Sequence, residues 1–168
     1  KDGLWAVLAW ANVLAVTGKS VQQIATEHWA RYGRHYYVRH DYDELSTAIA
    51  NSIVDGLRKS LPSLVGSRHG DWTISQADEF SYTDPVDGSL ATGQGLRIVF
   101  GDAARIILRL SGTGTEGATI RLYLERYESA ADRLGWNTSE ALAPLATIAD
   151  KLIRINEQSG RKGPSVIT

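Results

Sequence analysis

A run of small and hydroxyl residues between two arginines has the residue types of an anion-binding loop. It covers positions 109–121 and reads Arg-Leu-Ser-Gly-Thr-Gly-Thr-Glu-Gly-Ala-Thr-Ile-Arg. The glycines at positions 112, 114 and 117 can adopt positive φ, which lets several backbone N–H groups converge on one point. The hydroxyl groups add hydrogen-bond donors, and the two arginines add permanent positive charge. This combination predicts a loop that binds a phosphate group.

An ordinary hairpin turn is the alternative interpretation, because Gly/Thr-rich runs between strands are usually solvated turns. Two features favour the anion site. Arginines lie at both ends of the run, and it contains none of the Lys, Asn or Asp residues that usually decorate an exposed turn.

Residues 112–117 also match Gly-x-Gly-x-x-Gly, the fingerprint of dinucleotide-binding folds. In those folds the glycines open a helix, whereas the residues from Ala118 to Glu125 alternate with the period of a half-buried strand. No Gly-Lys-Ser/Thr follows to form a Walker A loop, and the chain lacks the strand lysine, HRD-type and DFG motifs of a protein kinase. These nucleotide-binding interpretations therefore fail.

Other candidate groups have weaker patterns. The histidines at positions 28, 35, 40 and 69 lack the spacing of metal ligands, so we expect structural or surface roles. Asp84 and Asp87 lie three residues apart around a Pro-Val pair, a composition that favours an ordinary turn over a cation site. Ser89 and Ser111 have no adjacent base that would make them nucleophiles. No complete catalytic centre is predicted, and no metal site is expected in this segment.

Composition limits the remaining function classes. The chain has 168 residues, of which 43% are hydrophobic and 22% charged, with a net charge of −1 and no cysteine. These values predict one good core and part of another, no general attraction to nucleic acid, and no disulfide or thiolate chemistry. The apolar run Leu4–Val16 is too short to span a bilayer, so we expect a buried helix, no membrane contact and a cytoplasmic protein. Because methionine is absent, we expect the chain to begin inside a longer polypeptide.

Hydrophobic periodicity predicts the order of the secondary-structure elements. Two packed helices are expected before a stop at Gly33, followed by an extended segment over 34–42. A third helix is expected over Asp43–Lys59, ended by Leu61-Pro62. Strands are expected over 72–75, 77–83, 95–101, 104–110 and 118–127, and a last helix runs from 138 to 155. This order indicates an α+β fold with a mainly antiparallel sheet after residue 33.

Several segments of the chain resemble the α-D-phosphohexomutases, in the glucose-phosphate branch formed by the phosphoglucomutases. The similar segments are Lys1–Trp10, Glu27–Gly33, Tyr82–Ser89, Arg109–Gly114 with Gly117–Tyr123, and Pro164–Thr168. The resemblance runs from the first residue to the last and is to the C-terminal part of these proteins.

The resemblance implies an architecture. Residues 1–33 would be the C-terminal helices of the third domain, which is an α/β domain. Residues 34–168 would be the fourth domain, whose sheet is similar to that of the TATA-box-binding protein. The domains upstream in the same polypeptide would then be the partners of this segment.

The resemblance also implies an activity. In the full enzyme a phosphoserine exchanges a phosphoryl group with glucose 1-phosphate, glucose 1,6-bisphosphate turns over, and glucose 6-phosphate is released with the help of Mg²⁺. The serine, metal and sugar-recognition loops of the family are missing here and would lie upstream of Lys1. We therefore expect this segment alone to be inactive and its ligand to be a phosphosugar.

Finally, the resemblance assigns site residues. Substrate phosphate binding falls to Arg109, Ser111, Gly112, Thr113, Gly114 and Arg121, and substrate contact to Lys1. Thr115 and Glu116 receive no role. A non-catalytic phosphosugar-binding or scaffold module of a mutase-like protein remains the alternative function.

Overall fold

Residues 2–114 and 117–168 are described by the computed structural model. Contacts between residues divide the chain into two units, each described here by itself. The first unit holds the residues up to Arg34 together with Glu128–Gly135. The second unit holds His35–Tyr127 and Trp136–Thr168.

Two capped helices form most of the first unit. Helix α1 (Gly3–Thr17) begins at Asp2, whose carboxylate accepts the N–H of Trp5 at 2.9 Å, and ends at Gly18 in the left-handed conformation. Helix α2 (Val21–Tyr32) begins with a capping box, in which Ser20 and Gln23 each accept the other's backbone N–H. These caps satisfy N–H groups that a helix end otherwise leaves unpaired, which explains the break at positions 18–20.

The expected burial of α1 and its packing are not found among the described residues. The helix is apolar on all sides, yet Trp5 is 68% exposed and Val16 is 85% exposed. Its axis meets that of α2 at 87°, and neither helix has a buried residue. A helix that is hydrophobic all round needs neighbours on every side, and the described residues of the first unit are too few to surround it.

Membrane-spanning length is not reached by any single helix among the described residues. Helices α1 and α2 pass the length and hydropathy test only when taken together, as a pair bent by 87°.

The second unit is built on a six-stranded sheet with the order β10-β1-β9-β8-β7-β4. Its strands are β1 (Arg34–Leu45), β4 (Gln76–Glu79), β7 (Leu96–Phe100), β8 (Ala104–Gly114), β9 (Gly117–Glu128) and β10 (Val166–Ile167). Every pairing with a described register is antiparallel. Two small hairpins lie apart from this sheet, β2–β3 (Arg68–His69, Trp72–Thr73) and β5–β6 (Tyr82–Thr83, Leu90–Ala91). The predicted α+β class with a mainly antiparallel sheet is confirmed.

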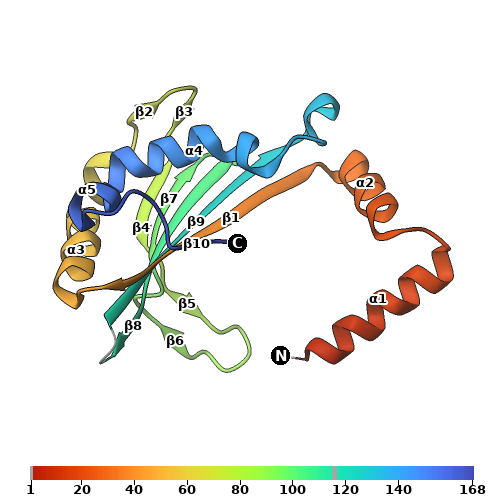
Figure 1. Ribbon diagram of the computed structural model, residues 1–168, viewed down its shortest axis with the longest axis horizontal. Helices are drawn as coiled ribbons and strands as arrows, with labels where there is room; N and C mark the ends of the chain where they lie inside the picture. Colours follow the sequence, from red (N-terminus) through yellow and green to blue (C-terminus); the bar gives the residue numbers. More distant parts are fainter. Residues whose placement is uncertain (1, 115–116) are drawn as a thin grey trace. The chain divides into compact units, whose positions relative to one another are not determined.

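The core lies between one face of this sheet and the helices. Alternate residues of β7 and β9 are buried, which is the period expected when one face of a strand is covered. They pack with buried side chains of α3 (Thr47–Leu64), α4 (Thr138–Ile153) and α5 (Ile155–Ser159). Figure 1 shows these three helices together along one side of the sheet. The other residues of each strand point to the opposite face, where the predicted loop residues lie.

Several predicted element boundaries are wrong. Helix α3 begins at Thr47, not Asp43, because residues 43–45 continue β1 and Ser46 caps the helix. It continues through Pro62. Proline has no N–H to donate within the helix, but Pro62 lies in the exposed last turn, where water can hydrogen-bond the carbonyl group that is left without a donor. The expected strand over 77–83 is interrupted between β4 and β5, and the last helix breaks at Arg154, which has φ of 57°.

Candidate phosphate-binding site

The predicted loop is the closed end of the longest hairpin in the sheet, formed by β8 and β9. Arg109 lies directly opposite Arg121 in the register, and Ser111 lies opposite Thr119. Side chains alternate between the two faces of a strand, so all four share the face that points away from the helices. The strand predicted after Gly117 is confirmed, since β9 begins there.

A β-bulge interrupts this hairpin at the loop. The register shifts between the pairs Ser111–Thr119 and Gly114–Gly117, so β8 carries one more residue than β9 across this interval. Gly112 takes a φ of 65° and Gly117 a φ of 102°, both in the region that favours glycine. A bulge bends the strand and leaves backbone groups outside the ladder, as an N–H cradle for an anion requires.

Glycine at position 117 also permits a close approach to β1. A Cβ atom there would lie 3.1 Å from the carbonyl oxygen of Leu45 and 3.3 Å from Cα of Glu44. Glycine at position 95 has the same function beside β8. A Cβ at Gly95 would lie 2.9 Å from Cγ of Arg109, so a larger residue would displace that side chain.

The charge arrangement at Arg109 and Arg121 is unusual for a sheet. Like charges directly opposite on an antiparallel pair repel each other and destabilise the pairing. Among the residues that the structure describes, neither arginine has an ion pair with a carboxylate. The Nε atom of Arg121 is buried and has no hydrogen-bond partner within that same part of the chain. The site therefore combines two cationic side chains with an unused donor.

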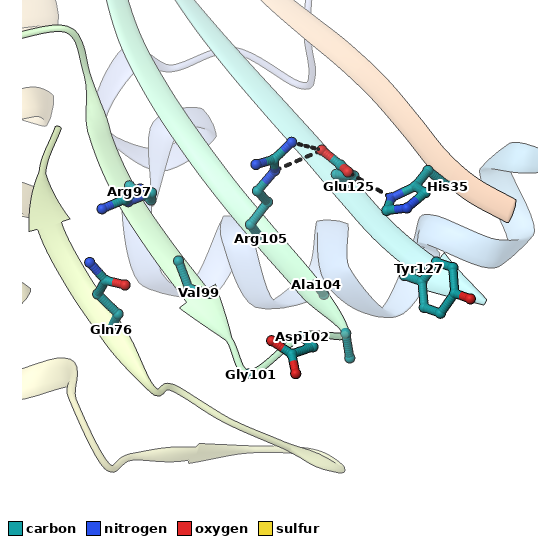
Figure 2. Close-up of a pocket in the computed structure, with 11 residues that line it drawn as sticks. His35, Gln76, Arg97, Val99, Gly101, Asp102, Ala104, Arg105, Glu125 and Tyr127 are labelled. Atoms are coloured by element: carbon teal, nitrogen blue, oxygen red, sulfur yellow. Dashed lines mark hydrogen bonds and ion pairs between the residues drawn. The ribbon is translucent and has the colours of Figure 1, made fainter. Parts of the chain in front are cut away.

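Arginines elsewhere on the same face are neutralised by their neighbours. A pocket of about 350 Å³ lies beside the turn between β7 and β8, and Figure 2 shows the side chains that line it. There Arg105 Nε donates to Glu125 Oε2 at 2.7 Å, and Oε1 of the same carboxylate lies 2.9 Å from His35 Nδ1. Arg97 likewise donates to Asp78 at 2.7 Å. In both cases the carboxylate is the register partner of the arginine, whereas Arg109 faces a second arginine.

Hydrogen bonds connect the returning limb of the loop to β1. Thr119 Oγ1 donates to Asp43 Oδ1 at 2.9 Å. No sequence motif identifies Asp43 or Gly95 as neighbours of the loop, because their relation to it depends on strands far apart in the sequence. Of the predicted residues, the structure brings together Arg109, Ser111, Gly112 and Arg121, with the backbone of Gly114. Lys1 and the side chain of Thr113 lie outside the described residues.

The alternative candidate groups remain separate. Within residues 2–114 and 117–168, no three His, Asp or Glu side chains gather as a metal site. The turn predicted at Asp84–Gly88 is confirmed. Asp84 accepts the N–H of Val86 at 2.8 Å, and Asp87 accepts the N–H of Ser89 at 2.8 Å. Hydrogen bonding from the Ser89 side chain, followed by the bond from its backbone N–H, lowers the pKa of the Asp87 carboxyl below its ordinary value.

Comparison with family models matches both parts of the chain. Residues 34–165 match the model described as "Phosphoglucomutase-1, C-terminal domain". Residues 1–32 match "Phosphoglucomutase/phosphomannomutase, alpha/beta/alpha domain III".

Individual relatives are similar over the whole chain. A phosphoglucomutase of Rhizobium radiobacter is 51% identical over 168 residues, covering 100% of this chain and 31% of the relative. A probable cytoplasmic phosphoglucomutase of Arabidopsis thaliana is 46% identical over 185 residues, covering 100% of this chain and 32% of the relative. The crystal structure of Paramecium pp63/parafusin in an open form superposes with a TM-score of 0.87 at 41% identity, covering 100% of this chain and 29% of that one. This chain thus spans about a third of the length of these proteins.

Proposed function

Because this chain belongs to the phosphoglucomutase family, we propose that it is part of an enzyme that interconverts glucose 1-phosphate and glucose 6-phosphate. Residues 34–168 form its fourth domain and residues 1–33 the end of its third. The loop between β8 and β9 binds the sugar phosphate that is not being transferred. The domain boundary is supported by the family models, one of which ends at residue 32 while the other begins at residue 34.

One observation carries this proposal, the register pair of Arg109 and Arg121, which lies two positions before the bulge in β8. Two guanidinium groups on one strand face repel each other until an anion lies between them. A phosphate dianion balances both charges and accepts paired N–H bonds from each planar fork. The open backbone at Gly112 and the hydroxyl of Ser111 complete a donor-rich cradle, to which we also assign Thr113 and Gly114.

The contribution of this segment to catalysis is to bind and orient the substrate. A fixed phosphate at one end of the sugar places the other end at the reacting groups, which converts binding energy into correct alignment. The bisphosphate intermediate presents either phosphate after turning over, so the same loop acts in both half-reactions. Lys1, from the preceding domain, is proposed to contact the substrate.

The remaining chemistry is assigned to domains upstream in the same polypeptide. The described residues contain no group of three His, Asp or Glu side chains that could hold a metal ion. We place the phosphoserine, the Mg²⁺ ligands and the loop that recognises the sugar in those domains. Plant relatives carry both cytoplasmic and chloroplastic names, and we propose the cytoplasm here.

Turnover of glucose 1-phosphate by the full-length protein tests this function. Formation of glucose 6-phosphate is followed in a coupled assay, for the natural protein and for Arg109→Ala and Arg121→Ala variants. Arg105→Ala is the matched control, since it removes an arginine from the same strand face whose charge is already paired with Glu125.

Turnover that falls in both site variants but not in the control supports the proposal. Turnover that is equal in all variants contradicts the site. If the natural full-length protein binds glucose 1-phosphate in calorimetry but has no turnover, it is instead the non-catalytic phosphosugar-binding module.

A further inference from the structure

Asp43 lies outside the loop and contacts it through its side chain. Its Oδ1 accepts a hydrogen bond from Thr119 Oγ1 at 2.9 Å, although 76 positions separate the two residues in the sequence. Thr119 is the register partner of Ser111 and lies two positions before Arg121 on the same face of β9. The bond therefore holds the limb of the loop that carries Arg121.

Asp43 is itself held in place by the C-terminal segment. Its backbone N–H donates to Ser165 Oγ at 3.1 Å, and its carbonyl oxygen accepts a bond from the guanidinium of Arg161. A second nitrogen of Arg161 donates to Ser165 Oγ at 2.9 Å, and the N–H of Ser165 donates to the carbonyl of Asp41 at 2.7 Å. The carboxylate of Asp43 thus extends from a backbone that is fixed on both sides of the residue.

A second contact reinforces the first. Immediately after Asp43, the chain passes Gly117 so closely that a Cβ there would lie 3.3 Å from Cα of Glu44. Glu44 adopts a φ of 55°, which is uncommon for a residue with a side chain. Strand β1 ends at the next residue, Leu45. The start of β9 is therefore held against β1 by its backbone at Gly117 and by its side chain at Thr119.

We propose that Asp43 is a positioning residue of the phosphate-binding loop, acting through its hydrogen bond to Thr119. This inference rests on the function proposed above and adds to it a residue from outside the loop. Asp43 does not act by its charge, because a carboxylate near a bound phosphate repels it and weakens binding. It acts as a hydrogen-bond acceptor that keeps Thr119 and the following Arg121 in register with Ser111 and Arg109.

A role of Asp43 as a hydrogen-bond acceptor and a role through its negative charge predict different results for Asp43→Asn. In Asp43→Asn the amide oxygen still accepts the Thr119 bond while the negative charge is removed, so substrate KM stays equal or falls. In Asp43→Ala and Thr119→Val the bond is lost, and KM should rise by about 3- to 10-fold, the effect of one hydrogen bond. Thr119→Ser keeps the hydroxyl and should retain the natural KM. The value of kcat should change less than KM in every case.

The experiment uses the full-length protein, with KM for glucose 1-phosphate and competitive inhibition by inorganic phosphate as readouts. The double variant Asp43→Ala/Thr119→Val should be no worse than either single variant, because both remove the same bond. Asp102→Ala is the control. Asp102 is an exposed carboxylate in the turn between β7 and β8, at the end of β8 opposite to the phosphate-binding loop. Thermal melts report folding, and if Asp43→Ala does not fold, the Thr119→Val and Thr119→Ser pair carries the test.

Three results overturn the inference. They are an unchanged KM in Thr119→Val, an Asp43→Asn variant as impaired as Asp43→Ala, and additive effects in the double variant. Arg121→Ala, measured in parallel, separates this inference from the proposed function. If Arg121→Ala leaves KM and phosphate inhibition unchanged, the phosphate site proposed for this loop fails. If it weakens both while Asp43→Ala and Thr119→Val do not, only the positioning role of Asp43 fails.

Discussion

Arg121 is the single side chain whose removal should affect function most without unfolding the protein. Its buried Nε has no hydrogen-bond partner among the described residues, and it faces Arg109 across the hairpin. A hydrogen bond to a charged group contributes about 1.5 to 3 kcal/mol, so kcat/KM of Arg121→Ala should fall by roughly 10- to 150-fold. Both reaction directions should lose comparably. Arg121→Lys should recover part of the loss, because an ammonium keeps the charge but not the fork.

Steady-state kinetics of the full-length variants measure this effect, with thermal melts as the control for folding. Removing one of two like charges relieves repulsion, so the melting temperature should not fall. An unchanged kcat/KM for Arg121→Ala would exclude this arginine from the site.

Gly117 is a backbone position at which an added methyl group should destabilise the protein. Gly117→Ala places a Cβ at 3.1 Å from the carbonyl oxygen of Leu45, on a residue with φ of 102°. Backbone strain of this kind costs about 1 to 3 kcal/mol, so the melting temperature and phosphate affinity should both fall. Gly135→Ala is the matched control, since a Cβ there meets nothing within 4 Å. Equal melting temperatures for the two variants would show that β1 can move away from the loop.

At the scale of elements, the attachment of the edge strand β4 to β7 should depend on pH. Asp78 and Arg97 are register partners on these strands, and hydrogen bonding to Arg97 is the main cause that lowers the pKa of the Asp78 carboxyl below its ordinary value of 3.8. As pH falls, the unfolded chain binds a proton at this position before the folded one does. The stabilisation is therefore complete above 3.8 and is lost as pH falls through the lower, folded pKa.

Thermal melts of the natural protein and Asp78→Asn test this dependence. Because the Asp78 side chain is 34% exposed, solvent screening limits the difference at neutral pH to about 1 kcal/mol or less. The natural protein should be the more stable at neutral pH, and the difference should shrink as pH falls below 3.8. A difference that is the same at both pH values would show that the charge of Asp78 is not involved.

At the scale of the whole molecule, we propose that the two units move relative to each other when a phosphosugar binds. The chain passes between the units at Arg34–His35, Tyr127–Glu128 and Gly135–Trp136, so any hinge must include all three crossings. A phosphate held between domains requires closure over it, and closure shields exposed joints. Limited proteolysis of the full-length protein should therefore be slower near these crossings when glucose 1-phosphate is present.

Mass spectrometry of the first fragments identifies the cleaved bonds. Cleavage in the exposed turn at Val86 supplies an internal reference within the second unit. If cleavage near Gly33 and near Gly135 is equally slow with and without substrate, while other loops become protected, the hinge lies elsewhere.

The sequence alone determined the features that depend on neighbouring residues. The alternation after Gly117 predicted a strand and thereby excluded a dinucleotide fold, and the structure confirms that strand. The arginines around the glycines predict an anion loop, which stays a prediction. The α+β class followed from the order of the periodic segments. Each of these signals is local, because side-chain alternation and turn chemistry are set within a few residues.

Only the tertiary structure decided which distant groups meet at the loop. The bond from Thr119 to Asp43 and the space that Gly95 leaves for Arg109 arise from strand pairing, which no local pattern encodes. The exposure of α1 was also missed, because hydrophobicity predicts that a helix needs covering but not whether the covering residues belong to the same chain. Likewise, residues 43–45 became strand rather than helix because pairing within the sheet outweighed their helical spacing. Local chemistry therefore predicted the anion loop, and contacts between distant segments decided which groups lie against it.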